Sequence, residues 1–143
     1  MVTIDRYLTV DPKYEASYIE EVRTFNMISH NMNDDCKPHL ESTACMIWVD
    51  ENGLIGELEC IYPIELEEDR GIRELKLEMA SGIPCIRVSY QEKAVKLFRD
   101  KDNVILFLTD EKQPDKRCHV GNLIYYVTGN ELIALECIKT KIV

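Results

Sequence analysis

CMIWVDENGLIGELECI, at residues 45–61, sets two apolar runs on either side of an Asn-Gly pair. Asn52-Gly53 favours the type I′ turn of a tight β-hairpin, because both central residues of that turn need positive φ. Alternation along the second run divides its side chains between two faces of one strand: Leu54, Gly56, Leu58 and Cys60 on one, and Ile55, Glu57, Glu59 and Ile61 on the other. The stretch therefore predicts an antiparallel hairpin.

LIYYVTGNELIALECI, at residues 123–138, repeats this pattern with one residue fewer. Both stretches end in Leu-Glu-Cys-Ile. An offset of 78 residues, which becomes 77 after the turn, relates the two hairpins and two earlier pairs, Val10 with Val88 and Ala16 with Ala94. Self-similarity at a fixed spacing indicates two units that bury a shared core. The extra residue of the first hairpin predicts either a bulge near Gly56 or a different turn.

These hairpins, together with a length of 143 residues and a hydrophobic fraction of 45%, predict one mainly β domain over residues 1–143. We expect two related antiparallel halves, at about residues 5–64 and 83–140, packed as a sandwich or a partly open barrel. An acidic connector joins them. Residues 15–22 and 72–79 favour strands but also suit a helix face, so an α+β fold with one short helix is the alternative. Residues 24–42 are expected to be mostly loop, with a short strand at 25–28.

The net charge of −9 argues against nucleic acid or an anionic membrane as partner, since both repel an acidic surface. It is compatible with a basic protein partner, although solubility alone also explains it. No stretch approaches the roughly 18 apolar residues of a membrane span. Asp5, Arg6 and Asp11 interrupt any apolar leader. We therefore expect a cytoplasmic protein whose six cysteines are reduced thiols.

The sequence contains no Gly-rich phosphate loop, no Gly-x-Ser-x-Gly elbow and no His-Glu-x-x-His helix motif. Ligand types for a tetrahedral zinc occur at four positions, but their spacing matches no standard zinc motif: Cys36, His39, Cys118 and His119. A Cys-His nucleophile at Cys36 is disfavoured, because Asp34 and Asp35 would raise its pKa. We predict no enzyme, no catalytic residue, no metal and no cofactor.

VDPKYEASYI, at residues 10–19, resembles the opening of a small bacterial domain family of unknown function. VDENGLIGELE, at residues 49–59, resembles the closing strand of that family. Two degenerate copies would cover most of the chain, although Val10 stands where the family usually has Tyr, and the second copy, at residues 88–90, lacks the Asp and Pro of the turn. The resemblance implies a compact β-rich fold and no assigned chemistry.

The size, charge and lack of a catalytic motif also resemble bacterial immunity proteins that neutralise nuclease toxins. This resemblance implies a non-catalytic acidic module that binds a basic toxin or nuclease. We predict the contact surface in the loop at 33–41 and the acidic run at 65–69: Asp34, Asp35, Glu41, Glu65, Glu67, Glu68 and Asp69. A solvated face is the simpler explanation of the same charges.

Large aromatic residues on the first strands of both hairpins, Trp48, Tyr125 and Tyr126, are expected to pack in the core or on a sheet face. An exposed aromatic there would instead anchor a partner. Two other functions remain open. One is a small enzyme or ligand-binding protein with a polar pocket between the halves. The other is an oligomerising domain that forms a homodimer through its strand edges.

Overall fold

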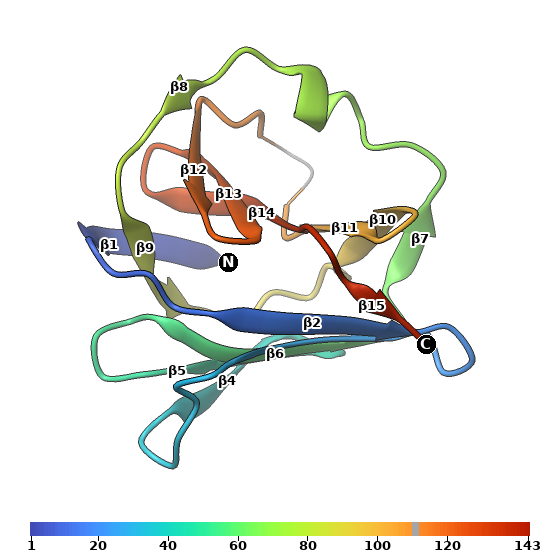
Figure 1. Cartoon of the computed structure of the whole chain (residues 1–143), viewed down its shortest axis with the longest axis horizontal. Helices are drawn as coiled ribbons and strands as arrows, with labels where there is room; N and C mark the ends of the chain where they lie inside the picture. Colours follow the sequence, from blue (N-terminus) through green and yellow to red (C-terminus); the bar gives the residue numbers. More distant parts are fainter. Residues whose placement is uncertain (110–111) are drawn as a thin grey trace.

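The computed structural model describes residues 1–109 and 112–143. Across these residues the chain folds into two β-sheets that pack face to face (Figure 1). One sheet has nine strands and the other has six. The prediction of a β-rich sandwich is confirmed, and in the described ranges the sheets do not close into a barrel.

The six-stranded sheet has its strands in the spatial order β15 (Lys141–Ile142), β2 (Tyr14–Ile19), β3 (Thr24–Ser29), β6 (Ile55–Ile61), β5 (Cys45–Val49) and β4 (Lys37–Ser42). The nine-stranded sheet runs β7 (Ile64–Leu66), β10 (Lys96–Asp100), β11 (Asn103–Phe107), β14 (Glu131–Cys137), β13 (Leu123–Thr128), β12 (Lys116–Val120) and β8 (Glu78–Met79). Its other two strands form a ribbon, in which β1 (Val2–Leu8) pairs with both β14 and β9 (Ile83–Val88).

The two halves of the chain repeat one strand order. The first half gives β2-β3-β6-β5-β4, and the second gives β10-β11-β14-β13-β12. The strand after each half then joins the sheet of the other half. Thus β7 pairs in parallel with β10, while β15 pairs in parallel with β2. The leading strands β1 and β9 pair with each other, and β1 also pairs with β14, so four strand pairings link the halves in the described ranges.

Both hairpins carry a bulge at the same point. In the first, Trp48 pairs with Glu57 and Val49 pairs with Ile55, which leaves Gly56 as the extra residue. In the second, Tyr126 pairs with Ala134 and Val127 pairs with Leu132, which leaves residue 133 as the extra one. The bulge near Gly56 was therefore predicted correctly, but it does not account for the length difference. The additional residue of the first hairpin lies in its turn.

The bulge also corrects the prediction for Ile55. One extra residue reverses the side-chain alternation, so Ile55 is buried with Leu58 and Cys60 instead of facing outward with Glu57. Gly56 sits where an added Cβ would meet the Cys36 sulfur at 2.7 Å. A larger residue at this position would have to displace that side chain.

The 78-residue offset relates structurally equivalent positions at the hairpins but not at Ala16 and Ala94. Ala16 pairs with Met27 on β3, and the residue at the corresponding place in the second half is Leu97, which pairs with Leu106 on β11. Ala94 is exposed and precedes β10. The offset changes along the chain because the halves differ in the lengths of their turns, so a constant spacing fails outside the hairpins.

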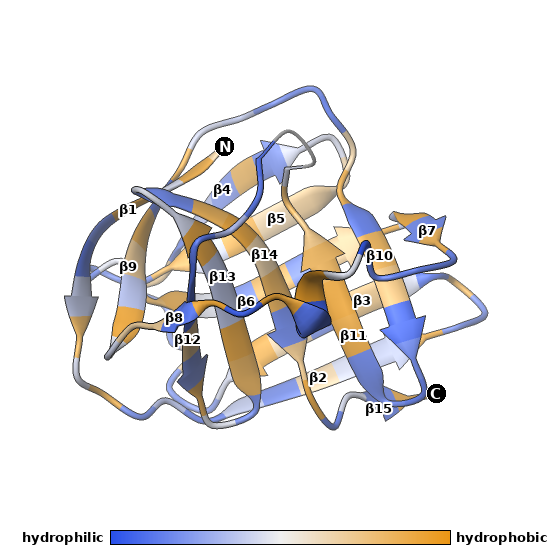
Figure 2. Ribbon diagram, turned by 90° about the horizontal axis from the view of Figure 1, so that it is seen from above, coloured by the Kyte–Doolittle hydropathy of each residue, from blue (hydrophilic) through white to orange (hydrophobic). Residues whose placement is uncertain are grey.

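The main core lies between the sheets and contains Leu58 and Leu135, both wholly buried. A second apolar cluster lies on the opposite side of the nine-stranded sheet, where it includes Ile105, Phe107 and Tyr126. The segment at residues 67–82, which we call the connector, crosses over this side (Figures 1 and 2). The nine-stranded sheet is thus covered on both faces, and β14 is buried along its whole length.

Two segments differ from their predicted structure. Residues 72–79 form neither a full strand nor a helix of several turns, but a single turn of 3₁₀ helix at Ile72–Glu74 followed by the short strand β8. Residues 24–42 contain two six-residue strands, β3 and β4, instead of one short strand in a loop. Residues 15–22 begin as the expected strand, because β2 runs from Tyr14 to Ile19. Within the described ranges, no helix is long and apolar enough to cross a membrane.

Candidate binding surface

The outward side of the six-stranded sheet has no covering segment among the described residues, in contrast to the nine-stranded sheet (Figure 1). Register places ten of its outward side chains in two cross-strand rows, which together we call the outer sheet face: Glu15, Ile28, Glu57, Trp48 and Pro38, and Ser17, Asn26, Glu59, Met46 and Leu40. All ten are exposed or half-buried. On β2, β3 and β5 their neighbours along the strand point into the core, as the alternation of a half-buried antiparallel sheet requires. On the edge strand β4, Lys37 and His39 are exposed as well.

The outer sheet face combines negative charge with apolar surface. Glu15, Glu57 and Glu59 supply three carboxylates, and neither row contains a basic residue. The apolar side chains gather on β4 and β5, where Leu40 is 44% exposed and pairs with Met46. The nearest lysine by register is Lys141 on β15, which pairs with Ser17 at the margin. Such a face suits a partner that is basic and partly apolar.

Trp48 stands in the middle of this face. It pairs directly with Glu57 on one side and with Pro38 on the other. The side-chain amide of Asn26 donates to Oε2 of Glu57 at 2.8 Å, whereas Oε1 accepts no hydrogen bond from the residues that the structure describes. Trp48 therefore packs on a sheet face, as predicted, and that face is the open one.

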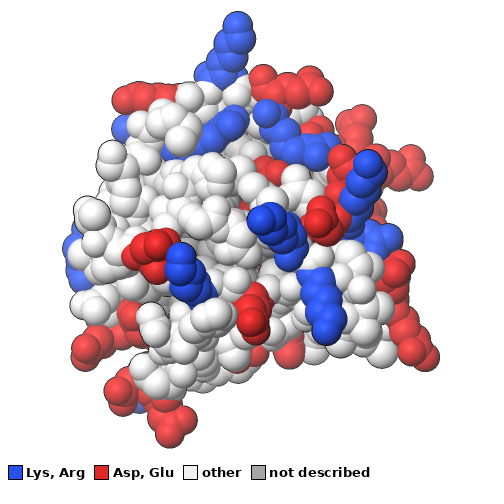
Figure 3. Space-filling view, in the orientation of Figure 1, with Lys and Arg blue, Asp and Glu red and all other residues white. Residues whose placement is uncertain are grey.

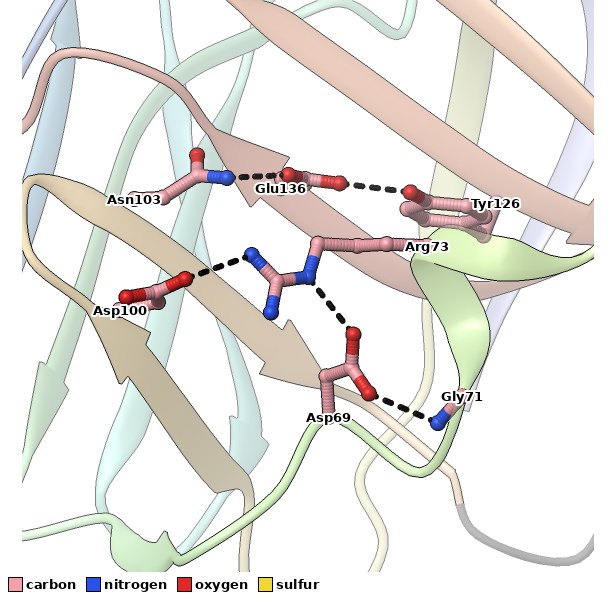
Figure 4. A network of polar contacts seen from close by, with 7 residues as sticks. All are labelled: Asp69, Gly71, Arg73, Asp100, Asn103, Tyr126 and Glu136. Carbon is pink, nitrogen blue, oxygen red and sulfur yellow. Dashed lines mark hydrogen bonds and ion pairs between the residues drawn. The ribbon is translucent and has the colours of Figure 1, made fainter.

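The corresponding aromatic residue of the second half, Tyr126, lies beneath the connector (Figure 4). Its hydroxyl donates to Glu136 at 2.6 Å, and the amide of Asn103 donates to the other carboxylate oxygen, also at 2.6 Å. Burial and the neighbouring Glu136 carboxylate raise the pKa of Tyr126. Glu136 is itself only 3% exposed, so these two bonds satisfy a buried charge.

We expect Tyr126→Phe to lower the free energy of unfolding by about 1–3 kcal/mol, because it removes a donor from the buried Glu136 carboxylate. Tyr62→Phe is the control, since the Tyr62 side chain is 60% exposed. That control should change stability by less than about 0.5 kcal/mol. Urea unfolding of both variants measures the difference. Equal losses in the two would show that the Tyr126–Glu136 bond contributes little.

The connector is held down by a second group of polar contacts (Figure 4). Asp69 accepts from the backbone N–H of Gly71 at 2.8 Å and from Nε of Arg73 at 2.6 Å. Arg73 also donates to Asp100 on β10 at 3.1 Å. The hydrogen bond from Arg73 lowers the pKa of Asp69. This network ties the connector to the nine-stranded sheet, so Asp69 has an internal role.

The seven predicted contact residues do not form one surface. Asp34, Asp35, Glu67 and Glu68 are exposed, Glu65 and Asp69 contact neighbours within the chain, and Glu41 is buried. The loop with Asp34 and Asp35 follows the Ser29 end of β3, whereas β7 lies near the Thr24 end, where Tyr62 N–H donates to the Arg23 carbonyl at 2.9 Å. Figure 1 accordingly shows the β3–β4 loop and β7 at opposite ends.

Glu41 corrects the prediction most clearly, because its side chain is 0% exposed and cannot reach a partner. The Gln91 side-chain amide donates to Oε1, while Oε2 has no hydrogen-bond partner in the described part of the chain. The amino group of Met1 lies 3.9 Å from Oε1. Burial raises the pKa of Glu41, against the opposing effects of Gln91, the Met1 amine and Ser42.

We expect Glu41→Gln to stabilise the protein at pH 7. The pKa of Glu41 in the folded protein lies above the usual value of 4.5. The free energy of unfolding therefore falls as pH rises from 4.5 through the folded-state pKa, because the carboxyl group must then ionise in a buried site. The variant should raise the melting temperature at pH 7 by about 2–4 °C, for about 1 kcal/mol, and have a smaller effect at pH 4. Glu67→Gln, at an exposed site, should change it at neither pH. A gain that is equal at both pH values would contradict this account.

A cleft of about 360 Å³ opens between the sheets beside β2 and β10. This is one place where the alternative of a site between the halves would lie, and larger clefts of about 600 and 450 Å³ are also lined by residues of both halves. The charged groups of the cleft beside β2 and β10 already pair with each other: Arg23 with Glu65 at 3.6 Å, Arg99 with Glu20 at 3.3 Å, and Tyr18 donating to Glu65. Burial and that bond raise the pKa of Tyr18 to about 12. These pairs join β2 to β7 and β10, which favours a role in holding the sheets together.

The four zinc-type ligands considered in the sequence, Cys36, His39, Cys118 and His119, do not come together in a group that could hold a metal ion. Cys118 is buried, and burial raises its pKa, whereas His119 is exposed and its Nε2 lies 3.1 Å from the Gly121 carbonyl. The six cysteines are all buried free thiols.

Strand β4 is the longest exposed edge of the six-stranded sheet. Several of its structural features oppose pairing with a strand of another chain. Pro38 has no N–H to donate, the register shifts between Leu40 and Ser42, and the Glu41 carbonyl accepts from Gln91 N–H at 2.9 Å. The end strand on the opposite edge, β15, has only two residues. These features weigh against a homodimer through strand edges.

The outer sheet face was not among the predicted contact surfaces, although some sequence features indicate it. Alternation had placed Glu57 and Glu59 together on one side of a strand, and Trp48 had been considered as an anchor. Only the register of four strands places Glu15 in the same row as Glu57 and Trp48. No protein-family model matches the chain, and no curated protein matches it.

Proposed function

We propose that this protein is a non-catalytic module that binds a basic protein partner through the outer sheet face. The observation that carries the proposal is the contrast between the two sheets. The connector covers the outward side of one, whereas the outward side of the other presents Trp48 among Glu15, Glu57 and Glu59. Aromatic anchors surrounded by complementary charge are typical of protein interfaces.

The outer sheet face alone is smaller than a stable protein interface. Five strands spaced about 4.8 Å apart, each contributing about five residues, span roughly 20 by 17 Å. A stable interface buries about 800 Å² on each partner, so surrounding residues must contribute. The β3–β4 loop borders the first row beyond Ser29 and Lys37, which makes Asp34 and Asp35 candidate rim contacts. Acidic side chains also project from the lower left and lower right margins in Figure 3, and such charge speeds the capture of a basic partner.

The concrete form of the proposal is a bacterial immunity-type protein that neutralises a basic nuclease or toxin in the cytoplasm. The acidic balance of 26 Asp and Glu against 17 Lys and Arg and the small size support it. Neutralisation would require only that the partner's basic surface be occupied, and so it needs no chemistry from this chain. A gene for a nuclease toxin beside the gene for this protein would support the proposal.

A capture experiment tests the proposal. The tagged protein is incubated with a lysate of its source organism at low ionic strength, and the bound material is eluted with a salt gradient. We expect a basic protein that elutes as salt screens the charges and that Glu57→Lys with Glu59→Lys fails to retain. Recovery of no basic protein at low salt, or equal recovery by the variant, would contradict the proposal.

A further inference from the structure

Arginine side chains recur in this protein between an aromatic ring and a carboxylate. The Arg73 guanidinium lies 5.2 Å from the Phe98 ring and pairs with Asp69 at 2.6 Å. The Arg99 guanidinium lies 5.6 Å from the Tyr18 ring and pairs with Glu20 at 3.3 Å. Both arrangements combine a cation–π contact with a charged hydrogen bond.

Trp48 and Glu57 place an aromatic ring and a carboxylate side by side on the outer sheet face, without an arginine between them. They are direct cross-strand partners, which places their Cβ atoms about 4.5–5.5 Å apart on the same side of the sheet. Of the described residues, no arginine stacks on Trp48. Cross-strand pairing fixes the positions of both residues, and the hydrogen bond from Asn26 to Oε2 holds the Glu57 carboxylate in place with Oε1 available.

We infer that Trp48 and Glu57 form a recognition site for an arginine side chain of the basic partner. This inference rests on the proposed function and names the type of partner residue that the site binds. A guanidinium is planar, so it can stack on the indole while its edge donates to Oε1 of Glu57. A lysine ammonium is a compact, strongly hydrated charge and cannot make both contacts as well. The site therefore favours arginine over lysine at equal charge.

Tryptophan fluorescence tests this inference directly, because Trp48 is the single tryptophan of the chain. The probes are capped hexa-arginine and hexa-lysine peptides, titrated separately at low ionic strength. We expect the arginine peptide to change the Trp48 emission and to bind about 5-fold more tightly than the lysine peptide, because only a guanidinium can stack on the indole and donate to Glu57 at the same time. Glu57→Gln should reduce this preference to less than about 2-fold, whereas Glu67→Gln should leave it unchanged.

The other outcomes separate failure of the inference from failure of the proposed function. If both peptides bind equally and both change the emission, electrostatic capture stands but the arginine site is wrong. If neither peptide binds, both ideas are overturned. If the emission shifts with protein concentration alone, a second copy of the chain covers Trp48, which also overturns the inference. The Trp48→Leu variant, followed by calorimetry, keeps an apolar side chain without the aromatic ring and should lose the preference for arginine.

Discussion

Leu58→Ala and Leu135→Ala should each lower the free energy of unfolding by about 3–4 kcal/mol, within the usual range for wholly buried leucines. Both side chains are 0% exposed in the core between the sheets. Leu58 lies between Ile47 and Met27 in its sheet, and Leu135 lies between Tyr125 and Leu106 in the other. The two positions are equivalent in the repeated strand order, so we expect losses that agree within about 1 kcal/mol.

Urea unfolding followed by circular dichroism measures both losses. Leu40→Ala is the control, because Leu40 is 44% exposed on the edge strand β4 and should cost less than about 0.5 kcal/mol. A small loss for either core variant would mean that only one half carries the core. That result would contradict the description of two halves with a shared interior.

Reversing two charges on the outer sheet face should have the largest effect on binding. Glu57→Lys together with Glu59→Lys places two cations beside Trp48, where a basic partner would meet like charge. We expect the affinity for the captured partner to fall by at least about 100-fold, since like charges across an interface cost several kcal/mol. Calorimetry at fixed ionic strength gives the dissociation constants.

Glu67→Lys together with Glu68→Lys changes the net charge of the protein by the same amount at exposed positions on the connector. It is therefore the matched control for long-range electrostatics. We expect this control to weaken binding by less than about 5-fold, because exposed charges beyond about 10 Å are largely screened at 0.1 M salt. If the control loses as much affinity as the face variant, net charge and not the outer sheet face governs binding.

The hairpins could be predicted from the sequence because their signals are local. Asn52-Gly53 and Gly129-Asn130 mark the turns, and the flanking apolar runs are long enough to require strands. Strand β4 could not be predicted in this way. As an edge strand it has four exposed residues in succession, including Pro38 and His39, so it lacks the alternation that identifies a half-buried strand.

The connector differs from its predicted structure for a different reason. Leu75 and Leu77 alternate with polar residues as a strand would, and their side chains do pack against the second apolar cluster. They contact a sheet face from above, however, and most of the segment makes no ladder. Side-chain alternation indicates that one side of a segment is buried. It does not indicate whether the backbone pairs with another strand, so it could not distinguish a covering segment from a strand.

The candidate surface depends on contacts that are distant in sequence. Glu15 and Glu57 belong to different strands, and only the register through Ile28 places them in one row with Trp48. The burial of Glu41 likewise could not be predicted from the sequence. Glu41 belonged to an apparently polar loop, and nothing in its local sequence distinguished a buried carboxylate from a solvated one.

Oxidative footprinting of the complex with the captured partner tests the central claim most directly. Hydroxyl radicals modify exposed Trp and Met side chains, and mass spectrometry locates the modified residues. We expect binding to protect Trp48 and Met46, while Met79 on the connector edge, 61% exposed, stays as reactive as in the free protein. Protection of Met79 with unchanged labelling of Trp48 and Met46 would contradict the account.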